Sequence, residues 1–236
     1  MTTFSFRPTL PVVLTVTAGF VDTAGFLALQ GLFTSHVTGN FVTLSAALVF
    51  GTSGALAKLL ALPAFCTVIF ATRFLSHGLA ARGLPVLRTI LTVKVVLLTI
   101  ACALAIHFGP FSNGDSWPAL ATGMTLVCAM AIQNGAQRVH LVSAPPTTVM
   151  TGTATQIMVD LADLSRADPL DSQSARRSRL KRMTASVVAF GSGCAAAALI
   201  FSQVGVLCFL VPPVLGMCTL MFRLTAFDGE IKTSSS

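Results

Sequence analysis

Long apolar segments set the strongest limit on what this chain can fold into. Six runs of about 20 residues are nearly free of charge: 9–30, 55–75, 86–107, 118–138, 183–202 and 204–223. About 20 apolar residues in a helix are needed to cross the hydrocarbon core of a bilayer. Only 10% of the residues are charged, against about 25% in soluble domains. The sequence therefore predicts an all-α, multi-pass membrane protein and excludes a soluble enzyme or a secreted disulfide scaffold.

Two shorter apolar runs, 38–50 and 147–161, lie between the long ones. The first would be only about 20 Å long as a helix, too short for an unaided crossing. The second is rich in threonine, which makes it a poor lipid-facing span. Both runs predict short re-entrant or broken helices enclosed by protein, where membrane proteins tolerate irregular backbone.

Positive charge decides between six and eight crossings. With six spans and both termini in the cytoplasm, all fifteen Lys and Arg except Lys58 and Lys94 are cytoplasmic or at the inner interface. With eight spans, arginines such as Arg82 and Arg88 fall outside. The positive-inside rule favours six spans in an inner membrane. It also explains the net charge of +7 without a nucleic-acid partner. The basic stretch 165–182 is expected to be a flexible cytoplasmic loop.

A weak internal repeat divides the single membrane domain into residues 9–107 and 118–223. Asp22 precedes a Thr-Gly pair at Thr38 by 16 residues, and Asn134 precedes another at Thr151 by 17 residues. Each half then continues with two long spans. Three spans in each half predict two inverted repeats, with a binding site near the bilayer midplane where short helices of both halves meet.

Four segments of the chain carry a family resemblance. Residues 18–29 (AGFVDTAGFLAL) and 31–40 (GLFTSHVTGN), with 133–136 (QNGA) and 147–153 (TTVMTGT), resemble the YoaK family. The resemblance covers essentially the whole chain. It implies a small bacterial multi-pass membrane protein, and it implies no activity because that family is biochemically uncharacterised.

Asp22 is the residue that most suggests function. It lies near the middle of the first span, where a carboxylate is costly and is usually functional or paired. It could couple transport to protons or cations, or it could pair structurally with Lys94, Asn134 or the hydroxyls of the Thr-Gly segments. His36 could relay protons, and Lys94 could be a counter-ion to Asp22 or reach the inner interface. Asp160 is expected to be solvated.

The two Thr-Gly segments are the second candidate feature. A Thr before Gly at the start of a short helix suits an N-cap, and two helix N-termini at midplane would attract an anion or a carbonyl oxygen. The same glycines could instead allow close helix packing. In the second half, the side-chain amides of Asn134 and Gln137 would complete the site. The predicted substrate- or ion-binding residues are Asp22, Thr38, Gly39, Asn40, Asn134, Gln137, Thr151, Gly152 and Thr153.

These features favour a transporter of a small polar or anionic solute. Asp22 could couple this transport to protons. A passive channel and a non-transporting scaffold or regulatory subunit remain alternatives. Residues 51–54 match the Gly-x-Ser-Gly pattern of rhomboid-type proteases, but the histidines that could serve as base lie at span ends or in loops. We therefore expect no enzyme activity, no cofactor, no metal and no nucleic-acid partner. The bilayer is the expected partner, and a homo-oligomer is left open.

Overall fold

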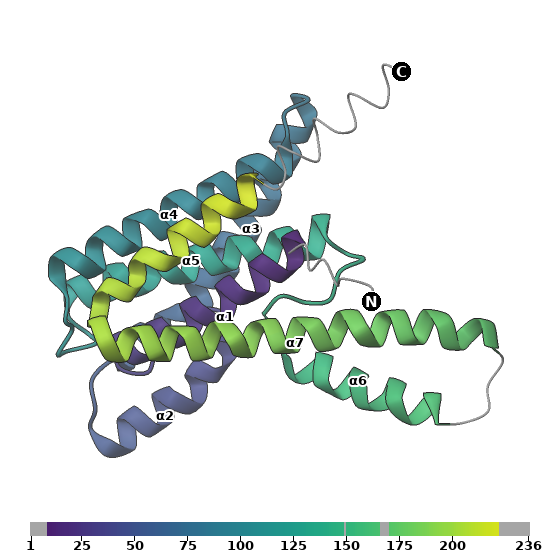
Figure 1. Ribbon diagram of the computed structural model, residues 1–236. Coiled ribbons are helices and arrows are strands. Elements are labelled where there is room, and N and C mark those ends of the chain that lie inside the picture. The colour runs from purple at the N-terminus through teal and green to yellow at the C-terminus, as the bar shows by residue number, and fades with distance from the viewer. Residues whose placement is uncertain (1–8, 149, 166–169, 222–236) are drawn as a thin grey trace.

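The computed structural model describes residues 9–148, 150–165 and 170–221 (Figure 1). Within these ranges every regular element is helical. The α-helices are α1 (Leu10–Ala28), α2 (Asn40–Phe50), α3 (Ala55–Ala81), α4 (Val86–Phe108), α5 (Trp117–His140), α6 (Met150–Leu164) and α7 (Leu170–Val204). Two 3₁₀ segments, η1 (Val37–Gly39) and η2 (Gly205–Leu210), precede α2 and follow α7. Residues 211–221 are again helical.

Five helical runs of the described chain are long and apolar enough to cross a membrane, namely α1, α3, α4, α5 and Gln173–Met221. The last run has 49 residues and would measure about 74 Å if straight, more than twice a hydrocarbon core. It is not straight. Gly205 has a φ of +58°, and the chain reverses there between the green α7 and the yellow segment (Figure 1). The prediction of an all-α multi-pass membrane protein is confirmed.

The two short helices, α2 and α6, coincide with the two short apolar runs of the sequence. They run in opposite directions away from the middle of the molecule (Figure 1). With 11 and 15 residues, they reach about 16 and 22 Å, less than the core of a bilayer.

The two halves of the chain are packed into each other. In the first half, α1 packs most extensively against α7 of the second half. In the second half, α5 packs against α3 and α4 of the first. Each short helix stays with its own half, α2 against α3 and α6 against α7. The interior is therefore built from both halves together.

The crossing of α1 and α7 depends on two glycines. A Cβ atom at Gly19 would lie 2.2 Å from the carbonyl oxygen of Phe190, and one at Gly193 would lie 2.2 Å from that of Val16. Since no side chain separates the two backbones at these points, the helices approach as closely as small residues allow in membrane proteins.

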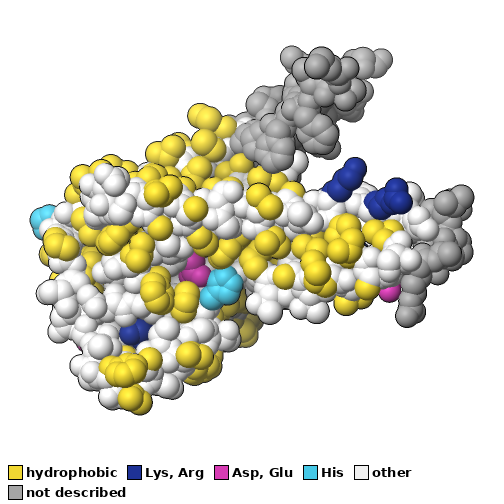
Figure 2. All heavy atoms as spheres, turned by 60° about the horizontal axis from the view of Figure 1, so that its bottom comes forward, with side chains coloured by type: hydrophobic (Ala, Val, Ile, Leu, Met, Phe, Trp, Pro, Cys, Tyr) yellow, Lys and Arg dark blue, Asp and Glu magenta, His cyan; other side chains and the backbone are white. Residues whose placement is uncertain are grey.

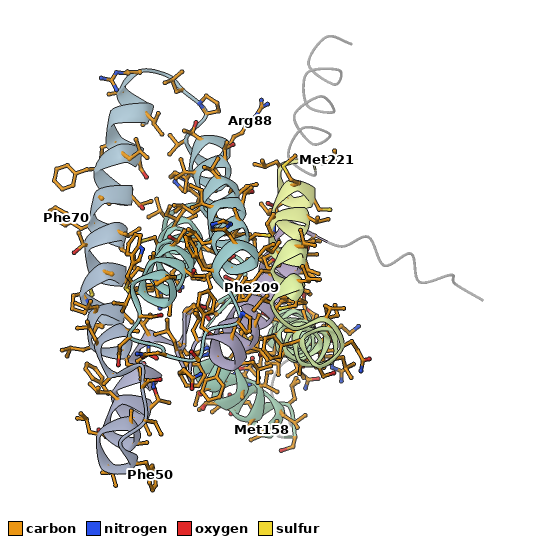
Figure 3. All side chains as sticks on the ribbon, turned by 90° about the vertical axis from the view of Figure 1, so that its left-hand side faces the viewer. Phe50, Phe70, Arg88, Met158, Phe209 and Met221 are labelled. Atoms are coloured by element: carbon orange, nitrogen blue, oxygen red, sulfur yellow. The ribbon has the colours of Figure 1, made fainter. Side chains whose placement is uncertain are left out.

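The outer surface of the molecule is largely apolar. Hydrophobic side chains spread across a whole face, and Lys and Arg gather over the first turns of α7 (Figure 2). Phe50, Phe70, Met158 and Met221 are exposed on the outside, whereas Phe209 is buried between helices (Figure 3). Exposed apolar surface on this scale suits a lipid environment.

The predicted flexible loop 165–182 is wrong over most of its length, because residues 170–182 form the first part of α7. Residues 166–169 lie outside the described residues. Arg, Lys, Leu and Ala are good helix formers, and the helix is anchored by Asp160 of α6. This carboxylate accepts hydrogen bonds from Nε and Nη2 of Arg179, and its side chain is only 1% exposed. Asp160 is therefore not solvated.

Acidification should release α6 from α7. The hydrogen bonds from Arg179 hold the pKa of Asp160 below its ordinary value of 3.8, with Gln156 contributing in the same direction. A group with a lowered folded pKa stabilises the fold fully above its unfolded pKa, and this stabilisation is lost as the pH falls through the folded pKa. We expect hydrogen exchange in α6 to stay slow from pH 7 to about 4, after correction for intrinsic rates, and to rise below that.

Asp160→Asn is the control for this measurement. It should expose α6 to exchange already at pH 7 and remove the acid transition. If hydrogen exchange in α6 of the wild-type protein rose between pH 7 and 5, another group would be holding α6 in place.

Candidate functional site

The carboxylate of Asp22 organises the loop that follows α1. The chain reverses after α1 at Gln30 and Gly31, whose φ values are +54° and +83°. It then returns beside α1. Oδ1 of Asp22 accepts hydrogen bonds from the backbone N–H groups of Thr34 (2.7 Å) and Ser35 (2.8 Å). The Thr34 hydroxyl donates to the same oxygen at 3.2 Å. Asp22 is therefore paired, as its depth in the span predicts, but its partners lie in its own loop.

The second oxygen of Asp22 holds His36. Oδ2 lies 2.6 Å from His36 Nδ1, and a carboxylate at this position accepts a hydrogen bond from the N–H of that nitrogen. The Asp22 side chain is 5% exposed and that of His36 is 34% exposed. Nε2 of His36 has no hydrogen-bond partner among the described residues. Asp22 therefore orients the imidazole, and His36 is the member of the pair that meets the surroundings.

A cavity of about 530 Å³ opens beside this pair. It is lined by Asp22, Thr23, Phe26, Phe33, His36, Thr38, Gly39, Phe190 and Cys194. On the corresponding face in Figure 2, an acidic side chain and a histidine adjoin each other among hydrophobic side chains. The cavity has the usual make-up of a small-molecule site, with apolar aromatic walls and a few convergent polar groups. It brings together four predicted site residues: Asp22, His36, Thr38 and Gly39.

Asn40 has a structural role in this loop. Its Oδ1 accepts the N–H of Phe33 at 2.9 Å, and its Nδ2 donates to the Phe33 carbonyl at 2.8 Å. Thr38 is not an N-cap, because the capping position of α2 is Gly39 and no side chain caps it. Instead Thr38 is exposed and lines the cavity.

A second cavity, of about 370 Å³, has Thr38 in its wall as well. Residues of α3 and α5 line it, among them Arg73, Arg138 and Asn134. No carboxylate is among its lining residues. The two cavities that Thr38 lines thus differ in charge, because one is lined by the Asp22–His36 pair and the other by two arginines.

The second half holds its own loop in a similar way, through amides. Oδ1 of Asn134 accepts the hydroxyl of Thr148 at 2.7 Å. Nε2 of Gln137 donates to the carbonyls of Leu141 and Ala144 at 2.9 and 3.3 Å. Asn134 and Gln137 therefore tie the loop after α5 to α5, as Asp22 ties the loop after α1 to α1.

The second Thr-Gly segment is placed differently from its prediction. Thr151, Gly152 and Thr153 lie in the first turn of α6, which begins at Met150, so Thr151 does not precede the helix as an N-cap. None of the three lines the cavity beside Asp22. The second half contributes Phe190 and Cys194 of α7 to that cavity instead.

Lys94 is not a counter-ion of Asp22, and it does not reach the interface. It is completely buried, and its Nζ donates to Oε1 of Gln133 at 2.5 Å. Gln133 in turn donates to the Leu14 carbonyl and the Thr147 hydroxyl, at 2.9 and 3.1 Å. This polar cluster joins α4, α5 and α1.

Sequence reasoning missed several residues at these sites. Thr34 and Ser35 act through backbone N–H groups, which every residue except proline carries. Phe190 and Cys194 reach the cavity only because α7 crosses α1. Arg73 and Arg138 line a common cavity only because α3 packs against α5.

The family model described as "Protein of unknown function (DUF1275)" matches residues 10–222. The chain is 27% identical over 169 residues to "UPF0700 transmembrane protein YoaK" of Bacillus subtilis (strain 168), covering 69% of this chain and 70% of that protein. No solved structure matches the chain.

Proposed function

Because this chain belongs to the DUF1275 family, whose description names no function, we propose its role from its own geometry. It carries a small anionic solute across the bacterial inner membrane, coupled to a proton at the Asp22–His36 pair. The family match and the similarity to YoaK confirm the resemblance in the sequence. The word "transmembrane" in that relative's name agrees with a multi-pass membrane protein.

One observation carries the proposal: Thr38 is a wall of both the Asp22–His36 cavity and the arginine-lined cavity. An anion attracted by Arg73 and Arg138 would lie in a cavity that shares the wall residue Thr38 with the cavity of His36. The guanidinium groups favour carboxylate and phosphate solutes. The aromatic side chains beside His36 suit a solute with an apolar part as well as a charged one.

Proton coupling follows from the unequal exposure of the pair. Asp22 is fixed by its hydrogen bonds and, as a carboxylate, places a negative charge next to the imidazole. His36 faces the cavity and can accept a proton at Nε2. Protonation would make the pair neutral overall and remove the repulsion between Asp22 and an incoming anion. Solute and proton would then bind together.

The proposed architecture has six spans in two inverted repeats, with α2 and α6 as the short helices of the two halves. It is supported by the packing between halves, of α1 on α7 and of α5 on α3 and α4. The opposite directions of α2 and α6 also support it (Figure 1). The basic residues around Arg82, Arg88 and the start of α7 would face the cytoplasm, together with both termini. The role involves no covalent reaction.

Proton-coupled uptake should depend on His36. Purified protein is reconstituted in liposomes that contain a pH-sensitive dye, and formate, acetate, lactate, benzoate or phosphate is added outside. We expect at least one anion to acidify the lumen faster than in protein-free liposomes. His36→Gln should reduce that rate at least tenfold, because glutamine cannot bind the proton. His77→Gln is the matched control, since His77 is exposed on α3 outside both cavities.

Labelling of Cys194 links transport to the site. An anion that is transported should slow alkylation of Cys194, which lines the cavity, and leave Cys66 unaffected. Anion flux that is not accompanied by protons and does not saturate would favour the passive channel. The absence of flux and of Cys194 protection across the whole panel would reject the proposal and favour the scaffold.

A further inference from the structure

A third cavity lies at the other end of α1, away from the Asp22–His36 pair. It has a volume of about 450 Å³ and is bounded by the first turns of α1, the loop after α5 and the middle of α7. Lys181 and Arg182 lie on its polar side, and Pro11, Val12 and Ala185 are among its apolar walls. We propose that this cavity binds the phosphate group of an anionic phospholipid.

No described residue neutralises the charges of Lys181 and Arg182 in the cavity. Lys181 has no hydrogen-bond or ion-pair partner among the described residues. Arg182 uses Nη1 to donate to Ser178 Oγ at 3.0 Å, which leaves the rest of its guanidinium group available. The nearby carboxylates of Asp160 and Asp163 are engaged by Arg179 and Arg176, and no carboxylate lines the cavity. Two adjacent cations without an acidic partner match a phosphate group.

The depth of the cavity favours a lipid over a free phosphate ion. The membrane-spanning helix α1 begins at Leu10, so the wall formed by Pro11 and Val12 lies where a span enters the bilayer. In α7, Lys181 and Arg182 directly precede Met183, where the apolar part begins. The cations thus lie at headgroup level, with apolar walls on the membrane side. A free ion would use only the cations, whereas a phospholipid would use both features.

The cavity is held in shape by a contact between its walls. Ser186 of α7 donates a hydrogen bond to the carbonyl of Pro146 at 3.1 Å, which fixes the loop after α5 against α7. Basic side chains are visible on this stretch of α7 in Figure 2. A preformed site loses less conformational freedom on binding than a flexible basic tail would.

Native mass spectrometry of the full chain tests the proposal, with dioctanoyl phosphatidylglycerol and dioctanoyl phosphatidylcholine as probes. We expect the wild-type protein to bind phosphatidylglycerol more tightly than phosphatidylcholine. Lys181→Gln/Arg182→Gln should weaken that binding about 30-fold. Arg177→Gln is the matched control, because it removes an exposed charge from the same helix outside the cavity, and it should change the affinity less than twofold.

Two results would overturn the proposal. Equal binding of both lipids, or equal loss in Arg177→Gln and the double variant, would show that the cavity does not recognise the phosphate group of an anionic lipid. Full displacement of phosphatidylglycerol by 10-fold excess inorganic phosphate would identify a free-anion site instead. Since lipid binding is measured without transport, a failure here leaves the transport proposal standing, and the reverse also holds.

Discussion

Replacing Gly193 by alanine should strongly destabilise the fold, whereas the same replacement at Gly191 should have almost no effect. A Cβ atom at position 193 would lie 2.2 Å from the Val16 carbonyl oxygen and 3.0 Å from the Phe20 nitrogen. These are backbone atoms of α1, which cannot rotate away as a side chain can. At Gly191 nothing lies within 4 Å of the new atom.

The expected cost at Gly193 is large for a single methyl group. Overpacking in a well-filled interior costs about 1–3 kcal/mol and sometimes more. Here the only relief is separation of α1 from α7, the most extensive helix pair in the structure. We expect a fall in Tm of more than 10 °C or the loss of monodisperse protein in detergent. Gly19→Ala should behave in the same way, because its Cβ would meet the Phe190 carbonyl at 2.2 Å.

Thermal unfolding of the three variants side by side measures this effect. Alanine has a higher helix propensity than glycine, so Gly191→Ala should be neutral or slightly stabilising. If Gly193→Ala had the Tm of wild type, the backbones of α1 and α7 could not be in contact at this position.

Two different replacements of Asp22 should distinguish its role in stability from its role in proton coupling. Asp22→Ala removes the acceptor of the Thr34 and Ser35 N–H groups. Each buried donor left without a partner costs about 1–3 kcal/mol, so we expect a strong fall in Tm and no transport. Asp22→Asn can still accept both N–H groups at Oδ1. It loses the negative charge beside His36, and we expect a nearly normal Tm with proton coupling reduced at least tenfold.

Asp115→Asn is the matched control for Asp22→Asn. Asp115 also accepts backbone hydrogen bonds, from Gly54 and Leu56 at 2.8 Å each, but it lies far from His36 in sequence and outside the cavity. It should leave coupling unchanged. Wild-type stability of Asp22→Ala would show that the carboxylate does not hold the loop, and full coupling in Asp22→Asn would show that its charge has no role in transport.

Much of the fold was predictable because the bilayer imposes a simple requirement. A crossing helix needs about 20 apolar residues, and the predicted runs 86–107 and 118–138 match α4 (Val86–Phe108) and α5 (Trp117–His140) within two residues at each end. The short run 38–50 similarly corresponds to η1 and α2. Asp22 stood out for the same reason, since a carboxylate inside such a run is costly unless it has a partner.

The partners themselves could not be predicted. Asp22 binds backbone N–H groups, which carry no signature of residue type. Lys94 donates a hydrogen bond to Gln133, 39 residues away in the sequence, because α4 packs against α5. The stretch 170–182 is helical and is anchored through Arg179 by Asp160 of α6, a contact that the local sequence does not reveal.

The sequence by itself determined that this chain is a multi-pass helical membrane protein with a carboxylate, Asp22, in its first span, because the length and hydropathy of a segment are local properties. Only the tertiary structure decided that Asp22 orients His36, and that Phe190 and Cys194 complete a cavity beside them. It also decided that Thr38 lines both that cavity and the cavity of Arg73 and Arg138. These relations depend on the crossing of α1 and α7 and on a loop folded back along α1, and the packing of distant segments has no counterpart in local sequence.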